Sequence, residues 1–330
     1  MSNKKEAYLC VSAMLRAREP KLLGSERAGR MLDAASYEEA AKLLTDCGYP
    51  DMSQMSAAEV EQTLAERRTA LFEELAALSP DKMLVDLFKL KYDYHNAKAI
   101  LKAEAVGSDC AHLLSDAGRV PGKRLMELYN EEKYSQLPEK LAASMAEAKA
   151  VLARTSNPQL ADFVLDKAYF TELRDAADAV DSDFLKGYVM LQVDAANLKS
   201  AVRTLRMGKN QDFLAEVLVP GGTVSAERVK AAADKEGLAA LFAHTKLEKA
   251  AALGAEALSG GGMTAFERAC DNAVSDYMRG AALISYGPEA VAAYLAAAEG
   301  EIQAVRMILT GRLAGVKPEL IRERLRDLYA

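Results

Sequence analysis

The stretch that decides the fold runs from Pro80 to Gly107, PDKMLVDLFKLKYDYHNAKAILKAEAVG, because the chain repeats it twice more in altered form. The second copy is DSDFLKGYVMLQVDAANLKSAVRTLRMG, from Asp181 to Gly208, and the third is PEAVAAYLAAAEGEIQAVRMILTGRLAG, from Pro288 to Gly315. Each copy carries an acid, then a base five residues later and a glycine fourteen residues later. The acids are Asp93, Asp194 and Glu301, and the bases are Lys98, Lys199 and Arg306. One element, used three times, organises the chain.

Each copy has the apolar spacing of a helix. In the first copy the apolar residues Leu87, Leu90, Tyr94, Ala97 and Leu101 recur at steps of three and four, and the other copies match these places. Such steps put side chains on one stripe of a 3.6-residue helix, which must be buried against neighbours. Pro80 and Pro288 suit a first helical turn, and the closing glycines suit left-handed C-caps. The pattern therefore predicts three equivalent long helices.

Composition predicts a nearly all-helical protein. Half of the 330 residues are hydrophobic, strand-like alternation is scarce, and residues that favour helices dominate. A repeat of about 100 residues is too long for solenoids built of ~34- or ~40-residue helix pairs. We therefore expect an all-α fold of three similar units with pseudo-threefold symmetry. The units are 1–107, 108–208 and 209–316, followed by a C-terminal helix at 317–330.

Charge and cysteine usage exclude several classes of protein. A net charge of −6 and a pI near 5.4 argue against a general nucleic-acid binder, which needs a basic excess. The four cysteines lie far apart without a CxxC pair, which favours free thiols over a disulfide scaffold or a zinc site. No run approaches the ~20 apolar residues that cross a bilayer, and the N-terminus lacks a secretory signal. We expect a cytoplasmic protein that meets a membrane only through another protein.

No motif predicts catalysis, a cofactor or a metal. The segment from Gly118 to Lys123 resembles a phosphate-binding loop, but its glycine spacing is one residue short and Arg124 stands where Ser or Thr belongs, so we interpret it as a turn before a helix. The histidines at 95, 112 and 244 are widely spaced, and no nucleophile lies beside them. We predict no catalytic, cofactor-binding or metal-binding residues and no cofactor.

The repeated polar positions are the candidate site. They are Asp93, Asn96, Lys98, Asp194, Asn197, Lys199, Glu301 and Arg306. One interpretation is that the charges form salt bridges between packed helices. The other is that equivalent charges from three units line a common surface that faces a partner. The third copy has Ala304 in place of the asparagine and is less polar.

The chain also resembles a known family over nearly its whole length. The resemblance depends on YLCVSAMLRAREPKLL near the start, DLFKLKYDYHNAKAILKA, the stretch from ADFVLDKAYFTELRDAA to FLKGYVMLQVDAANLKSAVRTLRMG, and SYGPEAVAAYLAAAEGEIQAVRMILTGRLAGVKPELIRERLRDLY at the end. On these segments it is similar to the C subunit of the bacterial and archaeal V-type (A-type) ATP synthases, and to the d subunit of the vacuolar ATPase.

The resemblance implies a funnel-shaped, non-catalytic rotor subunit of the central stalk. In that family the protein sits on the membrane-embedded proteolipid ring and receives the foot of the shaft formed by subunits D and F. It thereby links hydrogen-ion or other ion transport to ATP synthesis or hydrolysis. Two alternatives stay open: a free-standing helical scaffold that binds protein partners, and an enzyme whose site assembles between units. Shaft and proteolipid partners should co-purify only with a coupling subunit.

Overall fold

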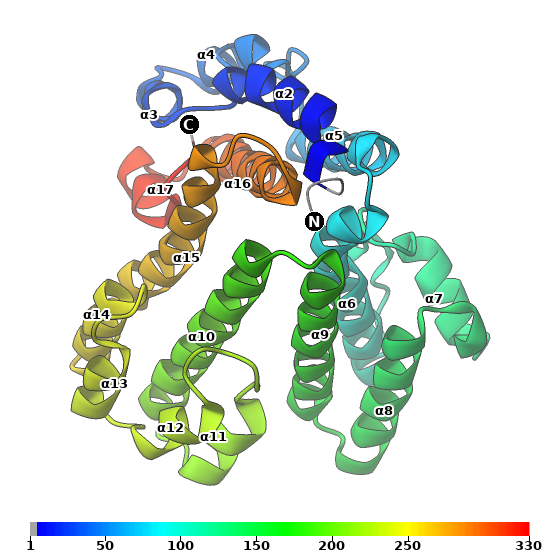
Figure 1. The fold of residues 1–330 in the computed structure, drawn as a ribbon, viewed down its shortest axis with the longest axis vertical. Coiled ribbons are helices and arrows are strands. Elements are labelled where there is room, and N and C mark those ends of the chain that lie inside the picture. The colour runs from blue at the N-terminus through cyan, green and yellow to red at the C-terminus, as the bar shows by residue number, and fades with distance from the viewer. Residues whose placement is uncertain (1–4, 330) are drawn as a thin grey trace.

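A computed structural model describes residues 5–329 of the chain (Figure 1). Over this range the chain forms α-helices and short 3₁₀ helices and no strand, so the prediction of an all-α fold is confirmed. The α-helices are α2 (Leu9–Arg18), α3 (Ser25–Asp33), α4 (Tyr37–Lys42), α5 (Ala57–Leu78), α6 (Lys82–Val106), α7 (Gly122–Asn130), α8 (Glu139–Thr155), α9 (Pro158–Val180), α10 (Asp183–Arg206), α11 (Gln211–Val217), α12 (Ala226–Ala231), α13 (Lys235–Phe242), α14 (Glu248–Leu258), α15 (Met263–Arg279), α16 (Pro288–Leu313) and α17 (Pro318–Arg324). None of the helices within residues 5–329 combines the length and the apolar character that a membrane crossing requires.

The three repeated stretches form the long helices α6, α10 and α16. Capping residues close to each terminus determine where these helices begin and end. The side chains of Asp81 and Ser182 cap α6 and α10, and Pro288 is the first residue of α16. Pro80 precedes Asp81, the N-cap residue of α6, so it lies in the connection between α5 and α6 and is not part of the first helical turn. The three closing glycines, Gly107, Gly208 and Gly315, have φ of 65°, 65° and 67°, as predicted for left-handed C-caps.

Each repeated helix is preceded by a long companion helix that leads into it through a short connection. The companions are α5, α9 and α15, and a capping box of Ser56 and Glu59 begins α5. Each companion packs on two repeated helices: α5 on α16 and α6, α9 on α6 and α10, and α15 on α10 and α16. The six helices therefore form a closed ring, in which α9 and α10 lie side by side (Figure 1).

Buried apolar residues divide into one shared core and three separate cores. The first halves of α6, α10 and α16 meet in the shared core, together with α2 and the last turns of the companions. The second halves diverge. That of α6 packs with α7, α8 and α9, that of α10 with α11 to α15, and that of α16 with α3, α4 and α5. Full burial of one Leu or Phe side chain stabilises a fold by about 1.5–3 kcal/mol. All three repeated helices bury such side chains in the shared core, so this core holds the helices in place relative to one another.

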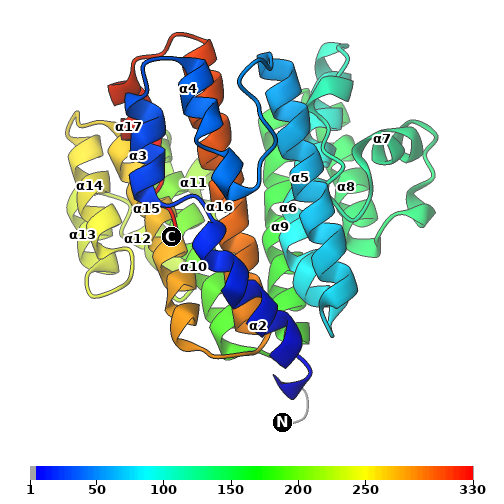
Figure 2. The same ribbon diagram turned by 90° about the horizontal axis from the view of Figure 1, so that it is seen from above.

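The two ends of the chain come together on α16. Figure 2 shows α2 crossing over α16, and α3 and α4 lie beside its second half. The guanidinium of Arg16 donates to the carbonyl oxygens of Ala281 (2.7 Å) and Ile284 (2.8 Å) just before α16. The separate core around the second half of α16 therefore contains helices from both the N-terminal and the C-terminal parts of the chain. The division at 107, 208 and 316, and the funnel-shaped pseudo-threefold arrangement, stay predictions.

Candidate functional site

In the first copy, two side chains of α6 hold the loop before α7. Oδ1 of Asp93 accepts hydrogen bonds from the backbone N–H groups of Arg119 (2.9 Å) and Val120 (3.2 Å). The amide of Asn96 pairs with both backbone groups of Ser115: its Nδ2 donates to the carbonyl (2.7 Å), and its Oδ1 accepts from the N–H (2.8 Å). Both side chains are buried. We call this arrangement, a buried carboxylate of a repeated helix that binds the backbone of a loop, a loop clasp.

The second copy forms the same clasp at the same spacing. The carboxylate of Asp194 accepts from the N–H groups of Thr223 (3.1 Å) and Val224 (3.0 Å), and the Thr223 hydroxyl also donates to it. Asn197 pairs with the carbonyl and the N–H of Val219, both at 2.8 Å. In both copies the asparagine holds a residue four or five positions before those that the acid holds. The repeat therefore extends beyond the helix to the loop that the helix holds.

The third copy closes its clasp on the opposite end of the chain. The N–H group of Leu23 donates to Glu301 at 2.7 Å, across 278 residues of sequence. The Tyr49 hydroxyl (2.7 Å) and the Arg67 guanidinium (3.3 Å) also donate to this carboxylate. Ala304 stands where the other copies have asparagine, so the two-way amide pairing is lost, and these side chains supply the added contacts.

Each clasped loop begins a helix. Val120, Val224 and Leu23 are followed directly by the N-cap residues of α7, α12 and α3. Two glycines permit the close approach: a Cβ atom on Gly118 or Gly222 would collide with the carboxylate of Asp93 or Asp194. The repeated acids therefore position the N-terminal ends of α7, α12 and α3.

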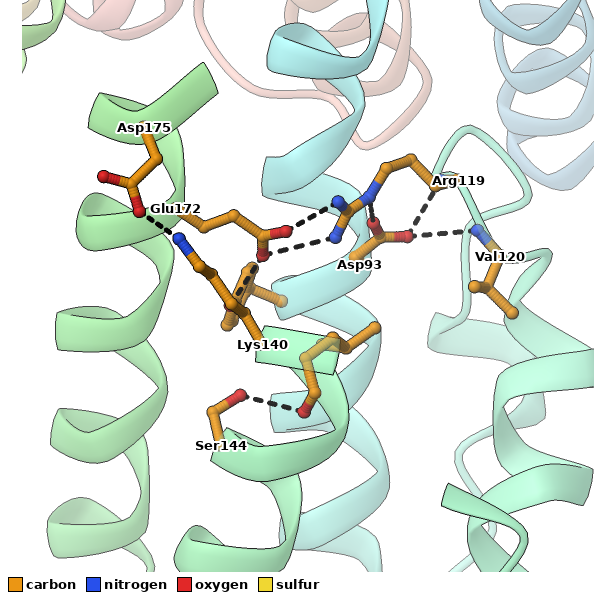
Figure 3. A network of polar contacts seen from close by, with 9 residues as sticks. Asp93, Arg119, Val120, Lys140, Ser144, Glu172 and Asp175 are labelled. Carbon is orange, nitrogen blue, oxygen red and sulfur yellow. Dashed lines mark hydrogen bonds and ion pairs between the residues drawn. The ribbon is translucent and has the colours of Figure 1, made fainter. Parts of the chain in front are cut away.

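The clasps of the first two copies differ in the charge of the donors that hold the acid. Nε of Arg119 donates to Asp93 at 2.6 Å, and its terminal nitrogens bind Glu172 of α9 (2.7 and 3.3 Å), as Figure 3 shows. The donors that Thr223 and Val224 offer to Asp194 are neutral. Burial raises the pKa of both aspartates, and the interactions with Arg119, or with Thr223 and the backbone, offset part of that effect. The same fold position thus pairs its acid with an arginine in the first copy and with neutral donors alone in the second.

The repeated bases join each long helix to its companion. Nζ of Lys98 lies 2.5 Å from Asp166 of α9, and Nζ of Lys199 lies 2.9 Å from Asp271 of α15. Arg306 pairs in the same way with Glu61 of α5. These contacts match the first interpretation of the bases, as salt bridges between packed helices.

The structure separates the eight candidate partner-facing residues into two sets. Asp93, Asn96, Asp194, Asn197 and Glu301 are buried, and loops of the same chain occupy their polar atoms. This burial corrects the expectation that these five side chains line a surface. Lys98, Lys199 and Arg306 are partly exposed, with side-chain exposures of 26%, 27% and 48%. For these three, contact with a partner stays a prediction.

A further buried charge network, which the sequence pattern did not single out, lies where the repeated helices meet. The carboxylate of Glu299 accepts from Nε of Arg68 (2.9 Å), from Lys91 and from the Tyr92 hydroxyl. Burial opposes the ionisation of Glu299, but Lys91 and Arg68 outweigh it and lower the pKa of the carboxyl. The available signal was position: Lys91, Gln192 and Glu299 each precede the repeated acid by two residues, with opposite charges in copies one and three.

The segments that the sequence offered for chemistry have structural roles. Residues 118–121 form the bent connection before a helix, as predicted, and α7 begins at Gly122, within the segment. Nε2 of His95 lies 3.1 Å from the carbonyl oxygen of Leu113. Within residues 5–329, His, Cys, Asp and Glu side chains nowhere gather in a group of three or more that could hold a metal ion.

Comparison with known proteins agrees with the resemblance noted in the sequence. The sequence profile of the family described as ATP synthase (C/AC39) subunit matches residues 11–324. The C subunit of the V-type sodium ATPase of Enterococcus hirae is 22% identical over 98% of this chain and 99% of its own length. The C subunit of the A-type ATP synthase of Methanocaldococcus jannaschii is 25% identical over 97% of this chain and 86% of its own length. The C subunit of the V-type ATP synthase of Thermus thermophilus is 27% identical over 62% and 65%, respectively. Because the profile spans nearly the whole chain, this protein belongs to the ATP synthase (C/AC39) subunit family.

Proposed function

We propose that this protein is a non-catalytic central-stalk subunit of a V/A-type ATP synthase or ATPase, which joins the membrane proteolipid ring to the shaft subunits D and F. The observation that carries the proposal is the family match over residues 11–324, together with relatives named as C subunits of such complexes. The protein would lie on the cytoplasmic side, peripheral to the membrane, and would contact the membrane only through the ring.

The closed ring of six helices suits the transmission of torque. A coupling must deform little under load, and close-packed interiors have low compressibility and transmit strain. The shared core joins all three repeated helices, and the loop clasps tie the outer helices to them. In this design the acids and asparagines stiffen the protein, and the chemistry of ATP remains with other subunits.

The regions at the two ends of the repeated helices carry exposed apolar side chains that suit partner contacts. Leu78, Met83 and Leu283 lie near the connections into the repeated helices, beside the shared core. Val106, Met207 and Leu313 lie at the opposite ends of the same helices. Stable interfaces bury at least ~1,000 Å² and match charge with charge. We propose that one rim binds the cytoplasmic loops of the ring and that the inner surface holds the shaft.

The test is reconstitution of the complex in lipid vesicles with and without this chain. Without it, the soluble head should still hydrolyse ATP at close to its full rate, but ATP-driven ion uptake should fall to background. Adding the purified chain back should restore uptake. Ion pumping at the full rate by a complex that lacks the chain would overturn the proposal, and so would loss of hydrolysis by the isolated head.

A further inference from the structure

A recess of about 150 Å³ opens where all three copies of the repeated helix meet. Phe88 and Lys91 of α6, Tyr188 of α10 and Gly300 of α16 contribute to its lining, with α15 closing one side. The rings of Phe88 and Tyr188 are stacked, with centroids 6.2 Å apart, and form an apolar wall. Such a volume holds about one side chain or a short stretch of backbone, which is too small for most cofactors.

Gly300 in this recess has no role that the chain's own packing explains. It lies in the interior of α16, it is exposed, and a Cβ atom built on it would have no heavy atom within 4 Å. An exposed glycine in a helix interior destabilises by about 1 kcal/mol relative to alanine. The same position in the other copies holds Tyr92 and Val193. A glycine at a position where a side chain would fit suits a site where another backbone approaches closely.

The charges beside the recess are unbalanced. Lys91 and Arg68 share the single carboxylate of Glu299. Arg68 is buried, whereas the Lys91 side chain is 34% exposed and lines the recess. Among these three groups one positive charge is left in excess. In a partly desolvated recess that excess favours a partner that brings a carboxylate.

We propose that this recess is the seat for a backbone segment of the central shaft that carries a carboxylate. The segment's backbone lies against Gly300, its carboxylate pairs with Lys91, and its neighbouring apolar atoms contact Phe88 and Tyr188. This inference depends on the proposed function, because the shaft is the partner named there. It adds which residues recognise the shaft and by what chemistry.

The test uses the full chain and the purified D–F pair of the same complex, with the dissociation constant measured by calorimetry. Gly300→Leu fills the recess, and Gly29→Leu is its control, since Gly29 also lies in a helix and a Cβ atom built on it would have no heavy atom within 4 Å. Lys91→Gln removes the excess charge, and Lys102→Gln is its control, an α6 lysine paired with Asp162 at 2.6 Å. Melting temperatures verify that each variant is folded.

We expect Gly300→Leu and Lys91→Gln to weaken binding at least tenfold, and Lys91→Gln to flatten its salt dependence. The two controls should bind as the original chain does. Binding by folded Gly300→Leu and Lys91→Gln at the original strength would overturn the recess assignment and leave the proposed function intact. Failure of the original chain to bind the D–F pair would overturn the proposed function itself, and this inference with it.

Discussion

Lys91 and Glu299 occupy the same position of the repeated helix, in copies one and three, and form an ion pair where the helices meet. The second copy has Gln192 there. This ion pair between the first and third copies therefore forms at a position where the two copies carry opposite charges. Arg68 also pairs with Glu299, and it lies on α5, the companion helix that packs on both α6 and α16.

Glu299→Gln should strongly destabilise the fold. The change leaves the buried guanidinium of Arg68 without a countercharge, and breaking a buried pair from one side costs about 3–5 kcal/mol. Urea unfolding followed by circular dichroism measures the loss. The double variant Arg68→Met/Glu299→Met removes both buried charges and should recover most of the free energy of unfolding. If the single variant were as stable as the original chain, the network would not hold the ring together.

The pH dependence of stability should have opposite signs at Asp194 and at Glu299. Burial raises the pKa of Asp194 above its ordinary value of 3.8, so the folded chain holds this proton to higher pH than the unfolded chain does. Its contribution to stability is present below pH 3.8 and is lost as the pH rises through the raised pKa. The stability difference between the original chain and Asp194→Asn should therefore fall over this range, by up to about 1.4 kcal/mol per pH unit.

Glu299 supplies the comparison. Although burial opposes its ionisation, Lys91 and Arg68 lower its pKa below 4.5, so its contribution is present above pH 4.5 and is lost as the pH falls through the lowered pKa. The stability difference between the original chain and Glu299→Gln should shrink on acidification. Curves of unfolding free energy against pH for both variants measure the two slopes. Slopes of the same sign would contradict the assignment.

The sequence predicted the repeated helices well because their signals are local. Apolar spacing, a capping residue and a closing glycine all act within a few residues, so the ends of α6, α10 and α16 could be placed to within about two residues. The role of the acids could not be predicted in this way. Asp93 holds a residue 26 positions away, and Glu301 holds Leu23 across 278 positions, so a solvent-facing charge and a buried clasp have the same pattern in the sequence.

Gly118→Ala and Gly222→Ala should each destabilise the chain, because the added methyl group collides with the clasping carboxylate. Crowding of this kind typically costs about 1–3 kcal/mol. Gly29→Ala is the matched control: its methyl group meets open space within α3, so it should stabilise by about 0.5–1 kcal/mol. Thermal and urea unfolding of the three variants tests the difference. A neutral Gly222→Ala would show that the loop can shift away from Asp194 without loss.

Glu301→Gln should loosen the N-terminal helices without affecting the other two clasps. The amide keeps one acceptor oxygen, but it removes the charge that Arg67 pairs with and one of the two acceptors that Leu23 and Tyr49 share. An unsatisfied buried group costs about 1–3 kcal/mol, which corresponds to roughly 5- to 150-fold faster amide exchange by local opening. Hydrogen exchange should therefore accelerate at Leu23 and along α3, and stay unchanged at Val120 and Val224.

Asp194→Asn is the reciprocal control for this experiment, since it should accelerate exchange at Val224 and leave Leu23 protected. The two variants together test whether each repeated acid acts on its own loop. Local effects are expected because the second halves of α10 and α16 lie in separate cores, and separately packed parts of a protein can open as separate units. If either variant accelerated exchange equally at all three loops, the clasps would share one cooperative unit, and the assignment of one acid to one loop would be wrong.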